Sequence, residues 1–194
     1  GYFDGFLDDF VAHGKLNTDL GNVRLDNVSM TRDSIGNTYS YLGEVVATHF
    51  NIGKFYDIPD LSYVSGKIQI DGTGLAEDNV HVLINGNFPE LVYNNYSYTG
   101  ISILNGKFRR QIFDGDFHVD DPNLKMDFKG IINNSNSNLP NFVFDAKIKL
   151  ANLSALGFMD KSHKNIFSTN LHINFHGNNI DNLDGQIIAT NMVY

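Results

Sequence analysis

Two histidines are the residues whose type and spacing come closest to a chemical site in this chain. His172 and His176 share one side of a predicted strand, because side chains alternate between the two faces. Imidazole is a common metal ligand, yet no Asp, Glu or Cys follows the same alternation beside them. We therefore expect no metal site. The chain has no cysteine, which excludes disulfides, zinc-thiolate sites and thiol nucleophiles.

Adjacent carboxylates are not expected to form an acid–base pair either. The side chains of Asp8-Asp9 and of Asp120-Asp121 would point to opposite faces of a strand, so we interpret them as turn residues. The turn at 120–123 lacks the calcium-binding pattern of an EF-hand, and Gly72-Thr73-Gly74 lacks the rest of a nucleotide-binding fingerprint. No Gly-x-Ser-x-Gly elbow occurs. We expect a protein that is not an enzyme, with no catalytic residues and no cofactor.

Composition and charge narrow the function further. The net charge of −8 argues against binding of nucleic acid and against a polybasic membrane-surface patch, because both need clustered Lys and Arg. With 194 residues, 42% of them hydrophobic, the chain can bury a core, and no run is long and apolar enough for a membrane-spanning helix. The sequence opens on Gly1 without a signal peptide. We expect a fragment of a longer protein, with 1–194 as a single elongated segment.

Alternation of apolar and polar residues dominates the chain and predicts β-strands with one buried face. In one such strand, Asp114, Asp116 and His118 separate the apolar positions. Helical turns are predicted at only two places, near 153–159 and near 179–183. The clearest alternating runs are 66–72, 80–88, 113–119, 124–132, 142–150 and 167–177.

Turn-forming residues mark where the predicted strands reverse. Asn94-Asn95 is predicted to form a tight hairpin turn, because Asn tolerates the positive φ that such turns need. Asp121-Pro122-Asn123 joins two further strands, since Pro donates no hydrogen bond to a sheet. The polar segment 133–138 is predicted to be a loop at the rim of the sheet.

A weak internal repeat predicts that the sheet grows by similar hairpins. Residues 13–18 and 21–26 match 114–119 and 123–128 in their pattern of glycine, apolar and acidic positions. A sheet of roughly ten strands must curl, split or be covered, and few helices are available to cover it. Two outcomes follow: a sandwich or closed barrel, or an open trough whose interior is filled by something else.

Tyrosines favour an alternative function, in which a non-enzymatic β-sandwich binding module recognises protein or glycan. Exposed tyrosines are frequent at recognition surfaces. Cross-strand pairing on a sheet would explain them without any ligand. The tyrosines concerned are Tyr39, Tyr41, Tyr93, Tyr96 and Tyr98.

Five stretches of the chain together resemble one known family. They are 10–22 (FVAHGKLNTDLGN), 50–54 (FNIGK), 93–98 (YNNYSY), 113–124 (FDGDFHVDDPNL) and 178–185 (NNIDNLDG). In their order and spacing they resemble the repeated middle region of the TamB family, the translocation and assembly module of the AsmA-like superfamily, in its Bacteroidetes form. The resemblance covers nearly the whole chain.

The resemblance implies an all-β fold in which a long antiparallel sheet curls into an open trough, or β-taco, with an apolar interior and one or two short helical turns. It also implies a protein anchored in the inner membrane that spans the periplasm and meets an outer-membrane barrel partner. Such a protein would carry phospholipid between the two membranes and support outer-membrane assembly or protein secretion. This chain would be one length of that conduit, without the anchor. Its free sheet edges would also allow an edge-to-edge dimer of the fragment.

Phospholipid acyl chains are expected to lie on the apolar face, where each buried CH₂ contributes about 0.8 kcal/mol. Glycines in phase with that face, namely Gly72, Gly86, Gly115, Gly130 and Gly177, are predicted to mark bends or bulges. The residues predicted to line the lipid groove are Ile68, Ile70, Val82, Ile84, Ile101, Ile103, Phe117, Met126, Phe128, Phe144, Ile148, Leu171, Ile173 and Phe175.

Overall fold

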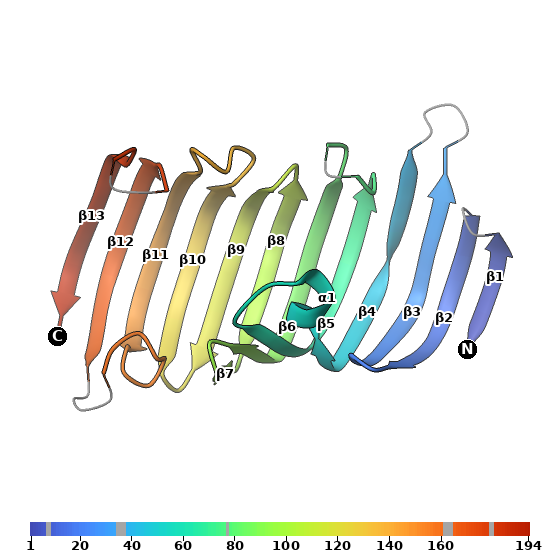
Figure 1. Cartoon of the computed structure of the whole chain (residues 1–194), viewed down its shortest axis with the longest axis horizontal. Helices are drawn as coiled ribbons and strands as arrows, with labels where there is room; N and C mark the ends of the chain where they lie inside the picture. Colours follow the sequence, from blue (N-terminus) through green and yellow to red (C-terminus); the bar gives the residue numbers. More distant parts are fainter. Residues whose placement is uncertain (7–8, 34–37, 77, 161–164, 179–180) are drawn as a thin grey trace.

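A computed structural model shows one antiparallel β-sheet with a single short helix (Figure 1). The residues that it describes are 1–6, 9–33, 38–76, 78–160, 165–178 and 181–194. None of their helices is long and apolar enough to cross a membrane. In chain order the elements are β1 Tyr2–Phe6, β2 Asp9–Thr18, β3 Gly21–Arg32, β4 Tyr39–Asn51, α1 Ile52–Tyr56, β5 Leu61–Thr73, β6 His81–Tyr93, β7 Tyr96–Tyr98, β8 Ile101–Arg109, β9 Ile112–Asp121, β10 Leu124–Asn133, β11 Asn141–Asn152, β12 Ile166–His176 and β13 Asp184–Val193.

The order of the strands in space follows their order in the chain. Neighbouring strands pair antiparallel throughout, except that β7 is a short branch on β6 and β8 continues the sheet from β6. The edge strands β1 and β13 lie at opposite ends, so the sheet is open (Figure 1). This confirms the predicted all-β trough. The described residues form one sheet and no second layer, which removes the sandwich and barrel architectures for this part of the chain.

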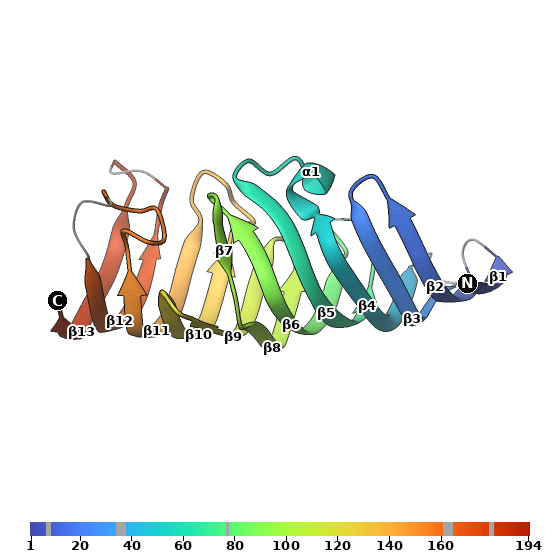
Figure 2. The ribbon, with the colours of Figure 1, turned by 90° about the horizontal axis from the view of Figure 1, so that it is seen from below.

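The sheet is curved across its strands (Figure 2). Seen from below, the strands rise from a common base, and α1 and β7 lie on the same, concave side. Tyr98 of β7 packs there against Ile101 and Val119. The concave side is therefore the apolar side, and we call its in-phase apolar residues the floor of the trough.

Cross-strand register aligns the floor residues into rows that run along the trough. Because side chains alternate between faces, a slip of one residue in any strand would break such a row. The central row crosses eleven strands through Gly14, Leu25, Val45, Ile68, Gly86, Ile103, Phe117, Phe128, Ala146, Leu171 and Ala189. The outer row crosses twelve strands through Gly5, Phe10, Met30, Tyr41, Gly72, Val82, Phe108, Phe113, Ile132, Phe142, Phe175 and Gly185.

Bulges keep the rows continuous where strands are irregular. Asn27, His49 and Asn105 have φ values of 50°, 47° and 53°, and a register shift lies at each of them. Asn and His adopt this left-handed conformation more readily than most residues. Ile103 and Phe108 both lie on the floor, although a regular strand would place residues at this odd spacing on opposite faces.

The glycines on the floor differ in whether the backbone at them is regular or irregular. Gly72 lies in regular register with both neighbouring strands, so the predicted bulge is absent there. Its missing side chain instead allows close packing: a Cβ atom on Gly72 would lie 2.7 Å from the ring of Tyr41. Positive φ values or a neighbouring register shift confirm the predicted irregularity at Gly86, Gly115, Gly130 and Gly177.

The helix α1 is not among the predicted helical turns. Its N-cap is Asn51, whose side-chain oxygen accepts a hydrogen bond of 2.8 Å from the N–H of Lys54. An Asn before a short apolar segment is the sequence signal for this cap. The predicted helical turn near 153–159 forms hydrogen-bonded turns and no helix. The turn predicted near 179–183 lies partly outside the described residues.

The predicted strand reversals are confirmed. Asn94 and Asn95 join β6 to β7 with φ values of 48° and 61°. Pro122 and Asn123 join β9 to β10, and the segment after Asn133 joins β10 to β11. The two repeated segments form the β2–β3 and β9–β10 hairpins, as the repeat predicts.

A buried carboxylate ties three connections together at one rim of the trough. Asp121 is fully buried and accepts hydrogen bonds from the Tyr96 hydroxyl at 2.6 Å and from the Asn123 N–H at 2.8 Å. The N–H and the hydroxyl of Thr99 donate to its other oxygen at 3.0 and 2.9 Å. The amide of Asn152 donates to the side-chain oxygen of Asn123 at 3.0 Å. The network holds β7, the β9–β10 turn and the β11–β12 connection together.

Replacement of Asp121 by Asn is expected to lower the free energy of unfolding by about 2–4 kcal/mol, because an amide nitrogen would then face buried donors. Urea denaturation measures the effect. The matched control is Asp120→Asn at the exposed neighbour that pairs with Lys125, where little change is expected. Equal losses in both variants would contradict the role given to the network.

The same carboxylate should give the stability a pH dependence. Burial raises the pKa of Asp121, but the hydrogen bonds from Tyr96, Asn123 and Thr99 outweigh burial and hold the pKa below its ordinary value. A group with a lower pKa in the folded state stabilises it above the unfolded pKa of about 3.9. This contribution is lost as the pH falls below that value. Acid titration of unfolding should therefore show a smaller loss for Asp121→Asn than for the wild type.

Replacement of Gly130 by Ala is expected to cost about 2–4 kcal/mol. Its φ is 149°, and a Cβ atom there would lie 2.4 Å from the carbonyl oxygen of Val143. Gly157→Ala is the matched control, because Gly157 also has a positive φ, of 84°, but a Cβ atom there would make only an ordinary contact of 3.5 Å with the side chain of Asn94. Urea denaturation should show the larger loss for Gly130→Ala. A larger loss for the control would show that the close approach to β11 is unimportant.

Candidate functional site

The fourteen residues predicted to line a groove all lie on the floor. Directly paired residues of an antiparallel sheet share a face, and the register links the fourteen across β5, β6 and β8 to β12. The central row holds Ile68, Ile103, Phe117, Phe128 and Leu171; the outer row holds Val82 and Phe175; between these rows lie Ile70, Ile84, Phe144 and Ile173; and on the side of β7 lie Ile101, Met126 and Ile148.

Most of this surface is incompletely covered by protein. Among the fourteen residues, Ile101 is 4% exposed and Ile173 is 8% exposed, and both count as buried. The other twelve are half-buried. Large continuous apolar patches are rare on proteins that have no partner for them. The floor is thus a surface with room for an apolar occupant.

Aromatic rings hold part of the floor in a fixed arrangement. The ring centroids of Phe128 and Phe144 are 4.7 Å apart, and those of Phe142 and Phe175 are 5.0 Å apart. Tilted ring pairs at these distances attract each other. The aromatic part of the floor is therefore formed before any ligand arrives.

Several floor residues are missing from the predicted set. Bulges explain some omissions, because one separates Leu25 from Met30 on β3 and another separates Ile103 from Phe108 on β8, so the alternation changes phase within each strand. Phe113, Ile132 and Phe142 belong to predicted alternating runs, so the alternation itself was the signal that could have included them. Among the omitted residues are Leu25, Met30, Tyr41, Val45, Phe108, Phe113, Ile132 and Phe142.

Part of the floor, along the rim on the side of α1, is covered by connections that fold back over it. Tyr98 from β7 and Leu156 from the β11–β12 connection pack on Ile101 and Val119, and all four side chains are buried. The Asp121 network fixes both covering segments. The rest of the floor, from this cluster to the opposite rim, has no such cover among the described residues.

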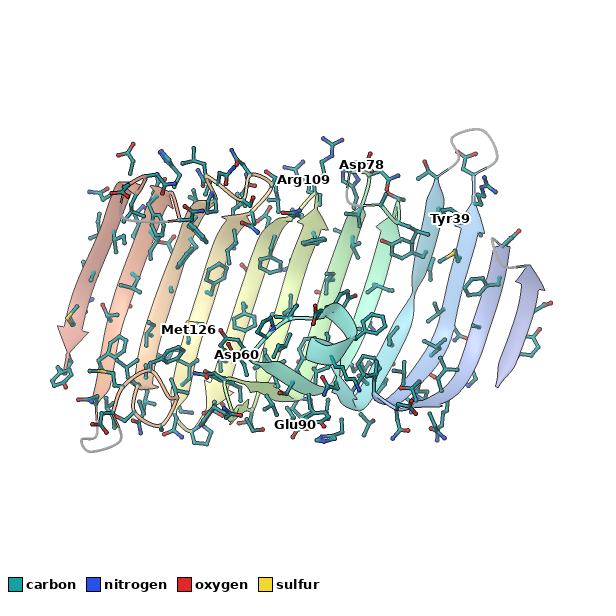
Figure 3. All side chains as sticks on the ribbon, in the orientation of Figure 1. Tyr39, Asp60, Asp78, Glu90, Arg109 and Met126 are labelled. Carbon is teal, nitrogen blue, oxygen red and sulfur yellow. The ribbon has the colours of Figure 1, made fainter. Side chains whose placement is uncertain are left out.

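The two rims of the trough differ in chemistry. The apolar rim, on the side of α1, exposes Phe55, Tyr56, Ile58, Phe158 and Met159. The polar rim consists of the β5–β6, β8–β9, β10–β11 and β12–β13 connections. It is richer in Asn and Ser, and the Asn178 amide donates to the carbonyl oxygen of Ser137 at 2.9 Å, but it also exposes Leu75, Leu139 and Leu183. Figure 3 shows Asp78 and Arg109 on the polar rim and Glu90 at the opposite one. A molecule lying across the trough would meet different groups at its two sides.

The convex face carries ion pairs between strands. Lys67 lies 2.6 Å from Glu44, Lys149 lies 2.7 Å from Asp127, and His118 lies 2.5 Å from Asp127. Hydrogen bonds from Lys149 and then from His118 hold the pKa of Asp127 below its ordinary value. Exposed pairs of this kind add little stability. They make the convex face hydrophilic and so fix which face of the sheet meets water.

The two histidines considered for metal binding each pair with a carboxylate. His172 lies 2.8 Å from Asp145, and His176 lies 3.6 Å from Asp184. Within the described ranges, no three His, Asp or Glu side chains are close enough together to hold a metal ion. These histidines therefore serve as cross-strand partners on the convex face.

The tyrosines considered for ligand recognition largely pack within the sheet. Tyr96 and Tyr98 form an edge-to-face pair with centroids 4.7 Å apart, and Tyr98 is buried. Tyr41 covers a floor glycine, and the ring of Tyr39 lies 5.8 Å from an arginine guanidinium. Tyr93, 40% exposed, is the one most open to solvent. Cross-strand pairing accounts for most of this group.

Searches against protein-family models, curated proteins and solved structures find no match to this chain. The function is therefore argued from geometry. The main feature is an apolar floor whose side chains form rows and are mostly half-buried. The floor lies between the polar rim and the apolar rim.

Proposed function

We propose that this chain is one length of a periplasmic β-trough that conducts phospholipid between the inner and outer membranes. The observation that carries this proposal is the uncovered apolar floor, in which rows of half-buried side chains cross the whole sheet. A surface without directional polar groups matches acyl chains, whose binding is driven by burial of apolar area.

The dimensions of the floor suit lipid tails. Twelve strands at a spacing of about 4.8 Å make a floor about 50 Å long. The tails of one leaflet occupy about half of a hydrocarbon core that is about 30 Å thick. Several lipids would therefore fit end to end along the trough.

The arrangement also suits movement along the trough. Most strands add an apolar side chain to each row, with glycine at a few positions such as Gly72 and Gly86. An acyl chain that shifts by one strand therefore exchanges one set of apolar contacts for another. Individual contacts of this type are weak and collectively large. The result is a surface with many similar binding positions and no single tight pocket.

The wider role of the segment follows from the TamB-like pattern of the sequence. The longer protein would be anchored in the inner membrane, meet an outer-membrane barrel partner and support outer-membrane assembly or protein secretion. Conduction of lipid requires no bond to be made or broken, so we propose a non-enzymatic protein. Recognition of protein or glycan by tyrosines has less support, because most of those rings are engaged within the sheet.

Replacement of Ile84 and Phe128 by Asn is expected to lower the phospholipid that co-purifies with the chain about tenfold, because two large apolar contacts on the floor are lost. Native mass spectrometry and lipid extraction measure the lipid per protein. Circular dichroism confirms that the variant is folded.

The matched control replaces Leu83 and Ile131 by Asn. These side chains are 51% and 38% exposed on the convex face, and they neighbour the same parts of β6 and β10. The control should retain its lipid. A wild-type chain without lipid, or an equal loss in both variants, would refute the proposed conduit.

A further inference from the structure

The β8–β9 turn has an unusual backbone for its residues. Arg110 and Gln111 are its two central residues, with φ values of 46° and 61°. Two-residue hairpin turns with positive φ favour Asn, Asp and Gly. The other described non-glycine residues with positive φ are all Asn, Asp or His, so this turn alone places other, longer side chains in that conformation. Strain of this kind is frequently found at functional sites.

Positive charge gathers at the same turn. Lys107, Arg109 and Arg110 are three of the fourteen Lys and Arg residues in a chain with a net charge of −8. Figure 3 shows Arg109 at the polar rim, beside Asp78. We call Lys107, Arg109 and Arg110 the basic tip.

The basic tip retains donors for a ligand. Nε of Arg110 donates to the carbonyl oxygen of Asp78 at 2.8 Å, which orients the guanidinium. Nζ of Lys107 lies 4.0 Å from Asp114, at the outer limit of an ion pair. Arg109 has no ion-pair or side-chain hydrogen-bond partner within the part of the chain that the structure describes.

The surroundings of the tip combine basic and apolar groups. Phe108 lies between Lys107 and Arg109 in sequence and belongs to the outer row of the floor, as does its partner Phe113. Because neighbouring residues of a strand point to opposite faces, Lys107 and Arg109 lie on the convex side and Phe108 lies on the floor at the same strand end. A depression of about 350 Å³ at this strand end is lined by residues of both faces, among them Lys107, Arg109 and Asp114 and the outer-row residues Val82 and Phe108.

We infer that the basic tip binds the phosphate group of a phospholipid whose acyl chains lie on the floor. Guanidinium groups bind phosphate oxygens through paired, charge-assisted hydrogen bonds. Arg110 lies in the turn at the polar rim, where a head group would emerge from the outer row, and Arg109 and Lys107 lie next to it on the convex side of the same strand end. The inference rests on the proposed function, and it adds the rim at which head groups are held.

The test is an NMR titration of the isotope-labelled chain with dihexanoyl phosphatidylglycerol below its micelle-forming concentration, and with inorganic phosphate in parallel. In Arg109→Gln/Arg110→Gln the Kd for the lipid is expected to rise about five- to tenfold, since each exposed charged contact contributes modestly. The matched control is Lys15→Gln/Arg24→Gln, which removes two charges from directly paired residues of β2 and β3. Its Kd should change by less than about twofold.

The outcomes separate this inference from the proposed function. An unchanged lipid Kd in the tip variant would overturn the inference and leave lipid binding on the floor intact. Inorganic phosphate that binds as tightly as the lipid would also overturn it, because the tip would then be an anion site independent of the trough. A wild-type chain that binds no lipid would overturn the proposed function and the inference together.

A second variant tests the meaning of the strained turn. Arg110→Asn/Gln111→Gly gives the turn the residues that it favours, and should raise Tm by about 2–4 °C. The same variant should bind the lipid more weakly, because Arg110 is lost. A higher Tm with unchanged lipid affinity would contradict a ligand role for Arg110. An unchanged Tm would overturn the claim that strain is retained for binding.

Discussion

The cross-strand register of one continuous antiparallel ladder is the constraint on which the rest of the structure depends. Residues as far apart in sequence as Gly14, Phe117 and Ala189 lie in one row only because every intervening strand keeps its phase. A slip of one residue in β9 would put Asp116 on the floor. Bulges at Asn27 and Asn105 insert extra residues without breaking the rows.

The two faces of this open, single-layer sheet differ in polarity and in how much protein covers them. Ion pairs such as Lys67–Glu44 and Lys149–Asp127 make the convex face compatible with water. The concave face has only a local protein cover, around Tyr98 and Leu156. Apolar area that the chain itself leaves exposed is available to stabilise a complex, at about 25 cal/mol per Å² removed from water. Because the described residues form a single layer, most of the floor is left without a protein cover.

Differences between the two rims give the trough a sidedness that a symmetrical channel would lack. At the apolar rim, the buried carboxylate of Asp121 fixes connections that fold back over the floor. At the polar rim, the two-residue β8–β9 turn and the end of β8 present Arg110 and Arg109. An amphiphile between these rims would keep its tails on the floor and its polar group at one side, because a charged phosphate is costly to bury without partners.

Local pattern in the sequence determined the strands, the hairpin turn at Asn94-Asn95 and the set of alternating residues that share a face, because side-chain alternation is a property of each strand by itself. Composition and alternation alone left an open trough and a closed sandwich or barrel unseparated, and only the family resemblance favoured the trough. Only the tertiary structure decided that the sheet stays open, that Phe108 joins the floor beyond a bulge, and that Asp121 is buried. These features depend on pairing between distant segments. The free energy of a cross-strand register depends on both strands, so it cannot be derived from the alternation within one strand.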